Sequence, residues 1–142
     1  TKLNNVLLDK STHKALCVID LDTVMPGLVA NDFGDSIRFG ASTASEDEPD
    51  LSRVNLSLEL YKSFSKGFLS GCGNKLENSE IETLPLGAKL MTLECGIRFL
   101  TDYILGDKYF KIKSPEHNLF RCRTQLKLVK SMEDNWDDMN KL

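Results

Sequence analysis

Two short apolar runs near the start of the chain predict a β-hairpin. Residues 5–8 form the first run, and residues 15–21 form a second run rich in strand-forming side chains. The stretch between them, residues 9–14, is polar and has the composition of a turn. The pattern therefore predicts two short strands joined by a tight connection.

The next part of the chain has few apolar residues at regular spacing. Proline and glycine interrupt residues 25–34, which favours a loop there and a short helix beginning near Asp32. Residues 43–50, TASEDEPD, form an acidic run, and such runs usually remain solvated. We therefore expect a mobile surface loop at residues 43–50.

Helical spacing dominates the remainder of the chain. Apolar residues within residues 52–69 recur at helical spacing, and the glycines that follow supply a stop. A short turn is expected at residues 78–84, and Pro85 is well placed to open a long apolar helix that ends at Gly106. A further helix is expected over residues 117–132. The fold class predicted is mainly α with a small β-hairpin, and residues 52–142 are expected to form a helical subdomain.

Composition narrows the class of protein. The 142 residues are 41% hydrophobic and 27% charged, which is typical of one globular unit. The net charge is -3 and the basic residues are scattered, so we expect no nucleic-acid partner. No apolar run approaches the roughly 20 residues that span a bilayer, so we expect no membrane partner and a cytoplasmic protein. Four widely spaced cysteines indicate reduced thiols, not a zinc site or a disulfide framework.

The polar residues around the predicted hairpin suggest phosphoryl-transfer chemistry. Transfer from ATP needs Mg²⁺ held by hard oxygen ligands, and kinase-like sites supply them from a D-x-K-x-x-N loop and a later aspartate. An aspartate placed before Thr1 would continue as x-K-x-x-N, which puts Lys2 at the phosphate-facing position and Asn5 at the metal position. Asp20 ends the second apolar run, and Asp22 points to the same side of an extended chain. This spacing predicts a Mg²⁺ site at Asn5 and Asp20, with Asp22 as a further candidate ligand.

A longer sequence segment makes the assignment to a kinase more specific. The segment VIDLDTVMPGLVANDFGDSIRFGA resembles the I-D-x-D region of the aminoglycoside phosphotransferase and choline kinase superfamily. Within it, DTVMPG followed by NDFGDSIRFG resembles the N-acetylhexosamine 1-kinases. The resemblance is sharp over residues 1–41 and weakens to a general helical pattern beyond them.

The resemblance carries several implications. It implies the C-terminal lobe of a protein-kinase-like fold, with residues 1–41 as the catalytic-loop and metal-binding segment and residues 1–142 as the substrate-binding part. It implies ATP and Mg²⁺ as cofactors, an N-acetylated amino sugar as the substrate, and phosphorylation at its anomeric hydroxyl. It also implies that Asp32 braces the catalytic loop.

The family's pattern also contains parts that this chain lacks. The His-x-Asp expected before Thr1 and the nucleotide-binding lobe are not in the sequence. We therefore expect the chain to be part of a larger enzyme, to be catalytically silent by itself, and to tend to dimerise through apolar surface that the rest of the enzyme would cover.

Three residues of the helical part are candidates for binding the sugar. Arg98 interrupts a very apolar helix, and a buried guanidinium needs a partner or a ligand. Tyr109 offers a hydroxyl in the connection that follows, and Trp136 offers an aromatic face for a pyranose ring. The structural alternatives are a salt bridge for Arg98, a half-buried core position for Tyr109 and an anchor of the tail for Trp136.

Two other functions remain open at the level of sequence. A kinase for another small alcohol, such as choline, an aminoglycoside or homoserine, would need an acidic pocket, which Asp134, Asp137 and Asp138 could supply. A non-catalytic binding module could also inherit the fold.

Overall fold

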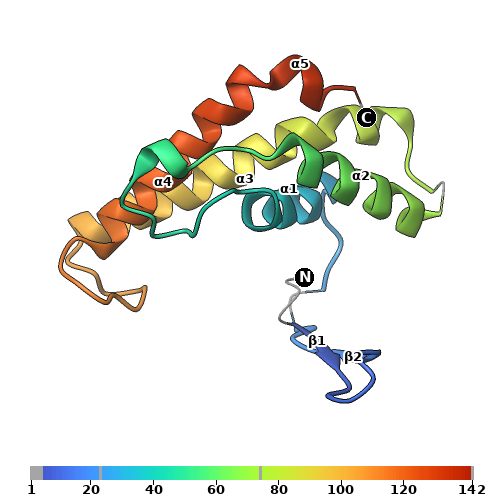
Figure 1. Cartoon of the computed structure of the whole chain (residues 1–142), viewed down its shortest axis with the longest axis horizontal. Helices are drawn as coiled ribbons and strands as arrows, with labels where there is room; N and C mark the ends of the chain where they lie inside the picture. Colours follow the sequence, from blue (N-terminus) through green and yellow to red (C-terminus); the bar gives the residue numbers. More distant parts are fainter. Residues whose placement is uncertain (1–4, 23, 74, 142) are drawn as a thin grey trace.

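The computed structural model describes residues 5–22, 24–73 and 75–141, and it is mainly helical with one small hairpin. Figure 1 shows the helices gathered in one body, with the hairpin standing away from it. In chain order the elements are β1 (Val6–Leu8), β2 (Ala15–Val18), α1 (Val29–Gly40), the short 3-10 helix η2 (Leu51–Arg53), α2 (Leu58–Cys72), α3 (Asn78–Ile104), α4 (His117–Asp134) and α5 (Trp136–Met139). The coarse fold class predicted from the sequence is confirmed.

The hairpin forms where the two apolar runs predicted it. Strands β1 and β2 are antiparallel, with Val6 opposite Val18 and a register shift after Leu7. The turn between them is closed by Asp9, whose Oδ1 accepts hydrogen bonds from the backbone N–H groups of Ser11 and Thr12 at 3.0 and 2.7 Å. An aspartate that bonds the backbone two residues on is a common turn device, so Asp9 has a structural role.

Helix α1 begins earlier than expected and is longer. It starts at Val29 and runs through Gly40, whereas the glycines and proline favoured a loop up to Gly34. Asp32 lies in its first turn, where a negative charge interacts favourably with the helix dipole. Gly34 lies inside the helix, at a crossing with α3 that leaves no room for a side chain.

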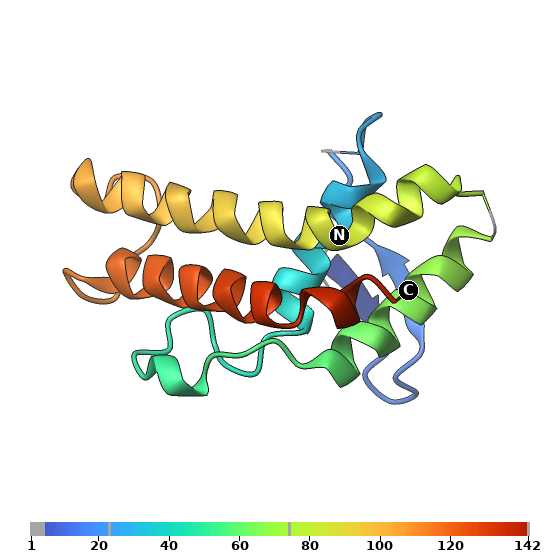
Figure 2. The same cartoon turned by 90° about the horizontal axis from the view of Figure 1, so that it is seen from above.

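Helix α3 is a single helix, although the sequence suggested a turn followed by a helix. Glu77 and Glu80 form a reciprocal capping box at its start, and Pro85 lies inside it, fully buried. A proline within a helix removes one backbone hydrogen bond and bends the axis, and Figure 2 shows α3 changing direction near its N-terminal end. The predicted boundary at Pro85 is therefore a bend inside one 27-residue helix.

Helices α2 and α4 lie close to their predicted positions. Helix α2 begins at Leu58, later than expected, because residues 51–53 form η2 and Leu56 pairs with Ser42 in an isolated bridge. It ends at Cys72 and is capped by Gly73, whose φ of 60° suits a glycine. Helix α4 begins at His117 as expected and runs two residues further, to Asp134.

The core lies between α1, α2, α3 and α4, and its tightest point is the crossing of α1 and α3. A Cβ added at Gly34 would clash with the backbone carbonyl of Gly87, and one added at Gly87 would clash with that of Ala30. The two backbones therefore touch, which only glycine allows. The cluster of fully or nearly fully buried apolar residues comprises Phe33, Ile37, Ala41, Val54, Leu56, Tyr61, Leu84, Ala88, Leu128, Met132 and Met139.

The C-terminal end is tied into this core. The hydroxyl of Tyr61 in α2 donates to the carbonyl of Met139 in α5 at 3.0 Å, and the backbone N–H of Leu56 donates to the hydroxyl of Ser131 in α4 at 2.9 Å.

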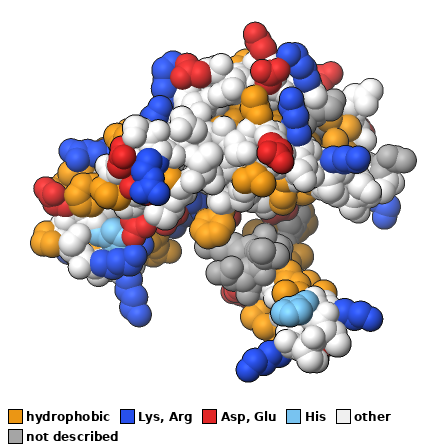
Figure 3. Space-filling model, in the orientation of Figure 1, with side chains coloured by type: hydrophobic (Ala, Val, Ile, Leu, Met, Phe, Trp, Pro, Cys, Tyr) orange, Lys and Arg blue, Asp and Glu red, His pale blue; other side chains and the backbone are white. Residues whose placement is uncertain are grey.

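In the space-filling view, apolar side chains gather on the hairpin and on the surface of the body above it (Figure 3). Of the described helices, none has both the length and the apolarity required of a membrane span.

Candidate functional site: a polar pair on the hairpin and a charged cavity beside α3

The structure brings together two of the residues that the sequence placed in a metal site. The side-chain Nδ2 of Asn5 donates to Oδ2 of Asp20 at 2.8 Å. The strand pairing produces this approach, because the carbonyl of Asn5 also accepts from the backbone N–H of Ile19 at 2.8 Å. Asn5 and Asp20 therefore lie on neighbouring strand ends and point toward the same place.

The backbone of Asp20 has an unusual conformation. Its φ is 63°, in the left-handed region that non-glycine residues seldom adopt. Such conformations cost free energy and cluster at functional sites. In this protein the conformation turns the carboxylate back toward Asn5, since the two side chains are hydrogen-bonded.

The donor set of this pair suits Mg²⁺. A carboxylate and an amide offer hard oxygen atoms, and Mg²⁺ in ATP sites commonly takes one or two protein ligands and fills its remaining positions with phosphate and water. Asp22 is exposed and lies in the turn after β2. Among the described residues there is no group of three or more His, Cys, Asp or Glu side chains suited to a metal.

Two further predicted residues are not joined to this pair by a described contact. Lys2 lies outside the described residues. Asp32 is exposed on α1, and its backbone carbonyl accepts from the hydroxyl of Ser36 at 2.9 Å. The bracing role of Asp32 therefore stays a prediction.

Arg98 and Tyr109, two of the three predicted sugar-binding residues, lie together. The guanidinium carbon of Arg98 is 5.8 Å from the ring centroid of Tyr109 and 5.6 Å from that of Phe110. The expectation that Arg98 is buried is wrong, since 51% of its side chain is exposed. The guanidinium can remain at the surface of an apolar helix because it stacks on two aromatic rings.

These residues border a cavity of about 390 Å³ between α1, α3, α4 and the loop after α3. Its wall carries charges of both signs, with guanidinium groups from three elements and carboxylates between them. The charged lining residues are Asp35, Arg38, Glu46, Glu94, Arg98, Lys111 and Arg121. A cavity of this size, with donors, acceptors and aromatic faces, fits a monosaccharide-sized polar molecule.

The loop that carries Tyr109 is held by Asp102. Oδ1 of this carboxylate accepts from the backbone N–H groups of Lys108 and Tyr109 at 2.9 and 2.8 Å, and Oδ2 accepts from that of Phe110 at 2.9 Å. Asn118 of α4 donates to Oδ2 at 2.9 Å. Burial acts to raise the pKa of Asp102, but these donors outweigh it and hold the pKa below its usual value.

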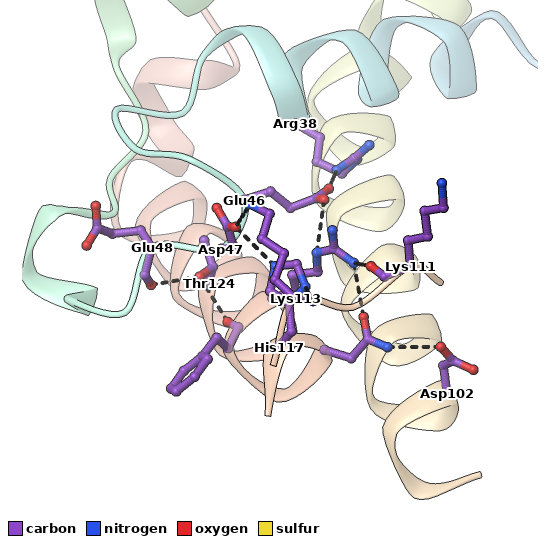
Figure 4. A network of polar contacts seen from close by, with 12 residues as sticks. Arg38, Glu46, Asp47, Glu48, Asp102, Lys111, Lys113, His117 and Thr124 are labelled. Carbon is purple, nitrogen blue, oxygen red and sulfur yellow. Dashed lines mark hydrogen bonds and ion pairs between the residues drawn. The ribbon is translucent and has the colours of Figure 1, made fainter. Parts of the chain in front are cut away.

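The acidic segment at residues 43–50 is not the free loop that its composition predicted. Figure 4 shows the side chains of Glu46 and Asp47 pointing toward the helical body. Glu46 accepts from Arg38 at 2.8 Å and lies 3.7 Å from Arg121, while Asp47 pairs with Lys113 at 2.7 Å. The composition rule failed here because two of the carboxylates pair with cations outside the segment, Glu46 with Arg38 of α1 and Arg121 of α4, and Asp47 with Lys113 of the loop after α3.

Asp47 also contacts the buried side chain of His117. Nδ1 of His117 accepts from the backbone N–H of Lys113 at 3.1 Å, so its proton belongs on Nε2, which lies 3.0 Å from the Asp47 carboxylate. Lys113 and His117 together hold the pKa of Asp47 well below its usual value. The acidic segment, the loop after α3 and the start of α4 are thereby fastened to one another.

Trp136, the third predicted sugar-binding residue, does not line this cavity. It is half-buried against the core, with Nζ of Lys89 5.6 Å from its ring centroid. Figure 2 shows α5, which carries Trp136, at the opposite end of α4 from the loop after α3. This arrangement favours the alternative of an anchor for the tail.

Sequence reasoning missed Arg38, Glu46, Asp102 and Arg121. The signal for Asp102 was a carboxylate inside an apolar helix, the same kind of interruption that drew attention to Arg98.

No protein-family model matches the chain.

Proposed function

We propose that this chain supplies the metal-binding hairpin and the acceptor-binding helices of an ATP-dependent kinase that phosphorylates the anomeric hydroxyl of N-acetylhexosamines. The observation that carries the proposal is the Asn5–Asp20 contact at 2.8 Å. The two residues are distant in sequence. The K-x-x-N spacing and the DTVMPG motif predicted both as ligands of one Mg²⁺ ion.

The roles within the site follow from chemistry. Asn5 and Asp20 would hold Mg²⁺, which when bound neutralises charge on the ATP phosphates and aligns the transferred group. Preorganised ligands avoid the cost of assembling the site during the reaction. The left-handed backbone at Asp20 would hold its carboxylate in such a preorganised position.

The cavity beside α3 is the proposed acceptor site. Arg98 and Tyr109 offer hydrogen-bond donors at its edge, and Phe110 beside them offers an apolar face for the sugar ring. In Figure 1 the hairpin and the loop after α3 both project below the helical body, the loop at its left end and the hairpin further to the right.

The charges favour a neutral acceptor over a cationic one. Asp134 and Asp138, which could have formed an acidic pocket, each pair with a lysine of the same helical stretch at 2.7 Å, Lys130 and Lys141 respectively. They also lie beside Trp136, away from the cavity. A kinase for choline or an aminoglycoside therefore receives less support than a sugar kinase.

The test is a phosphorylation screen of the full-length protein that contains this chain. With ATP and Mg²⁺ we expect N-acetylglucosamine and N-acetylgalactosamine to yield sugar 1-phosphates, identified by the phosphorus–anomeric proton coupling in NMR spectra. Choline, homoserine and an aminoglycoside, which all carry a cationic nitrogen, serve as comparison substrates. Product from a cationic alcohol alone would contradict the proposed acceptor, and no ATP-dependent product from any of them would contradict the kinase proposal.

A further inference from the structure

Helix α3 has a second apolar face, which the described part of the protein leaves exposed. Figure 2 shows α3 along one edge of the helical body, and its inner side meets α1 at Gly87 and α4 at Gly96. On the outer side, apolar residues recur at intervals of four, three, four, three and four residues. These residues, which we call the outer stripe, are Leu86, Leu90, Leu93, Ile97, Leu100 and Ile104. Apart from Leu93, which is half-buried, each is between 37% and 71% exposed.

The spacing of the outer stripe is typical of a helix that packs against another helix. Intervals of three and four residues average 3.5, so the stripe stays on one line when two helices wind around each other. It begins just after the bend at Pro85 and spans about 27 Å at 1.5 Å per residue. A single exposed leucine needs no explanation, but a continuous apolar stripe marks an interaction surface.

The order of the intervals is the same when the outer stripe is read in either direction. An antiparallel second copy of α3 therefore places an apolar residue opposite each apolar residue of the first copy. The opposed pairs are Leu86 with Ile104, Leu90 with Leu100, and Leu93 with Ile97. An interface with a two-fold axis requires this self-complementarity, because one surface contacts itself. The stripe therefore fits a second copy of this chain.

The two ends of the outer stripe also match in shape. At its first end, Leu86 and Leu90 border a groove of about 230 Å³ together with residues 27–31 at the start of α1. At its last end, Ile104 is 71% exposed in the final turn of α3. Two-fold pairing brings Ile104 of each copy to the groove of the other, because Ile104 lies opposite Leu86.

Charges beside the outer stripe favour the antiparallel orientation. Glu94 and Arg98 lie on one flank of the stripe, 3.9 Å apart, and both side chains are about half exposed. In a parallel pair each would face its own kind, and like charges across a helix interface are unfavourable. In the antiparallel pair the order along the interface is Arg98, Glu94, Glu94, Arg98. Each carboxylate then lies within about one helical turn of a guanidinium from both copies.

We propose that the outer stripe is a dimer interface, at which α3 packs antiparallel on α3 of a second copy and Ile104 of each copy fills the groove beside Leu86 of the other. A single pair of helices of this length covers less than the roughly 1,600 Å² of a standard interface, so the dimer should be reversible, with a dissociation constant that is roughly micromolar. The proposal is independent of the kinase proposal, because it uses no residue of the hairpin and requires no catalytic activity.

Sedimentation equilibrium of the full-length protein that contains this chain measures the dimer. Ile97→Glu places a charge in the middle of the outer stripe, where the side chain is 54% exposed in one copy, so it should fold normally by circular dichroism. It should weaken dimerisation by at least about 100-fold, because a charge would be buried against apolar side chains. Leu126→Glu is the matched control, since Leu126 is 45% exposed on α4, outside the stripe. It should leave the dissociation constant within about threefold of the parent value.

A pair of opposite charges tests the orientation. Leu86→Glu and Ile104→Lys should each weaken the dimer, but the double variant should dimerise more tightly than either, because antiparallel packing brings the two new charges together across the interface. The two positions are about 27 Å apart within one helix, so this recovery can arise only between copies.

Three results would overturn the proposal. They are a double variant that dimerises more weakly than both single variants, an Ile97→Glu protein that dimerises as well as Leu126→Glu, and a full-length protein that stays monomeric up to roughly a hundred times the expected constant. The last result would mean that another segment of the full-length protein covers the outer stripe.

Discussion

Asp20 joins a costly backbone conformation to a specific side-chain contact. Its φ of 63° would be avoided by most residues other than glycine, asparagine and aspartate. The hydrogen bond from Asn5 repays part of this cost, but both residues lie on an exposed hairpin where neither supports a core. The kinase proposal attributes the combination to a ligand that both side chains share.

Replacing Asp20 separates these explanations. Asp20→Asn in the full-length protein keeps the shape of the side chain and tolerates a positive φ, so the thermal midpoint should change by less than about 2 °C. Kinase activity should fall by about 100-fold or more, the scale on which a lost electrostatic stabiliser is felt. The measurements are kcat with saturating sugar and a thermal melt.

Asp137→Asn is the matched control for this variant, because it removes the same charge from an exposed position on α5. It should retain full activity. An Asp20→Asn enzyme within about threefold of the parent would remove Asp20 from the metal site.

Asp102 illustrates a residue whose role the sequence could not reveal. Its four hydrogen bonds come from Asn118 and from backbone groups of a loop whose path depends on tertiary structure. By contrast, Asn5 and Asp20 were selected by the K-x-x-N spacing and by the family resemblance, and strand pairing fixes their distance once the hairpin is predicted. Local geometry was predictable, and long-range capping of a loop was not.

Replacing Asp102 should loosen the wall of the acceptor cavity. Asp102→Asn places an amide N–H₂ against backbone donors, so the loop with Tyr109 and Phe110 should lose its anchor. We expect the thermal midpoint to fall by roughly 5 °C or more and KM for the sugar to rise more than kcat falls. Hydrogen exchange at Tyr109 and Phe110 should quicken, and unchanged exchange would show that the carboxylate does not hold the loop.

At the scale of elements, the approach of α1 to α3 decides how the helices assemble. Gly34 and Gly87 allow two backbones to touch, and this contact fixes the position of α1 relative to the longest helix. The sequence pattern treated Gly34 as a loop signal because a glycine looks the same in a turn and at a helix crossing. Pro85 was ambiguous in a similar way, since it can begin a helix or bend one.

The crossing can be tested with alanine. Gly34→Ala should lower the free energy of unfolding by about 2–3 kcal/mol, because the new methyl meets the carbonyl of Gly87 and the backbone cannot move away cheaply. Gly67→Ala is the matched control, since Gly67 lies inside α2 with nothing within 4 Å of an added Cβ. It should stabilise by about 0.5–1 kcal/mol through helix propensity. Chemical denaturation of both variants gives the comparison, and equal effects would contradict the close crossing.

At the scale of the whole molecule, carboxylates fasten segments that the hydrophobic core does not join. Asp47 links the acidic segment to the loop after α3 and to α4, and Asp102 links α3 to the same loop and to α4. Figure 4 shows these contacts as one network along the side of the body that carries the proposed acceptor cavity. Helix periodicity predicted the body, but the loops around the site depend on charges paired over long distances in sequence.

This network should make the protein sensitive to acid. The pKa values of Asp47 and Asp102 are both lowered by folding, so each carboxylate stabilises the fold above its unfolded pKa of about 3.9, and that stabilisation is lost as the pH falls through the lower folded value. The thermal midpoint should therefore be steady between pH 7 and 5 and decline below pH 4. Asp47→Asn and Asp102→Asn should each flatten the decline, and a midpoint at pH 3 equal to that at pH 7 would contradict the prediction.

Salt should distinguish the two carboxylates. The Lys113 partner of Asp47 is 76% exposed, so 1 M NaCl should screen much of that ion pair and reduce its share of the acid response. Asp102 is bound by backbone N–H groups and the Asn118 amide, which carry no net charge for salt to screen. At high salt the decline below pH 4 should therefore be smaller in Asp102→Asn than in Asp47→Asn, because the contacts that anchor the wall of the proposed acceptor cavity are hydrogen bonds to neutral donors.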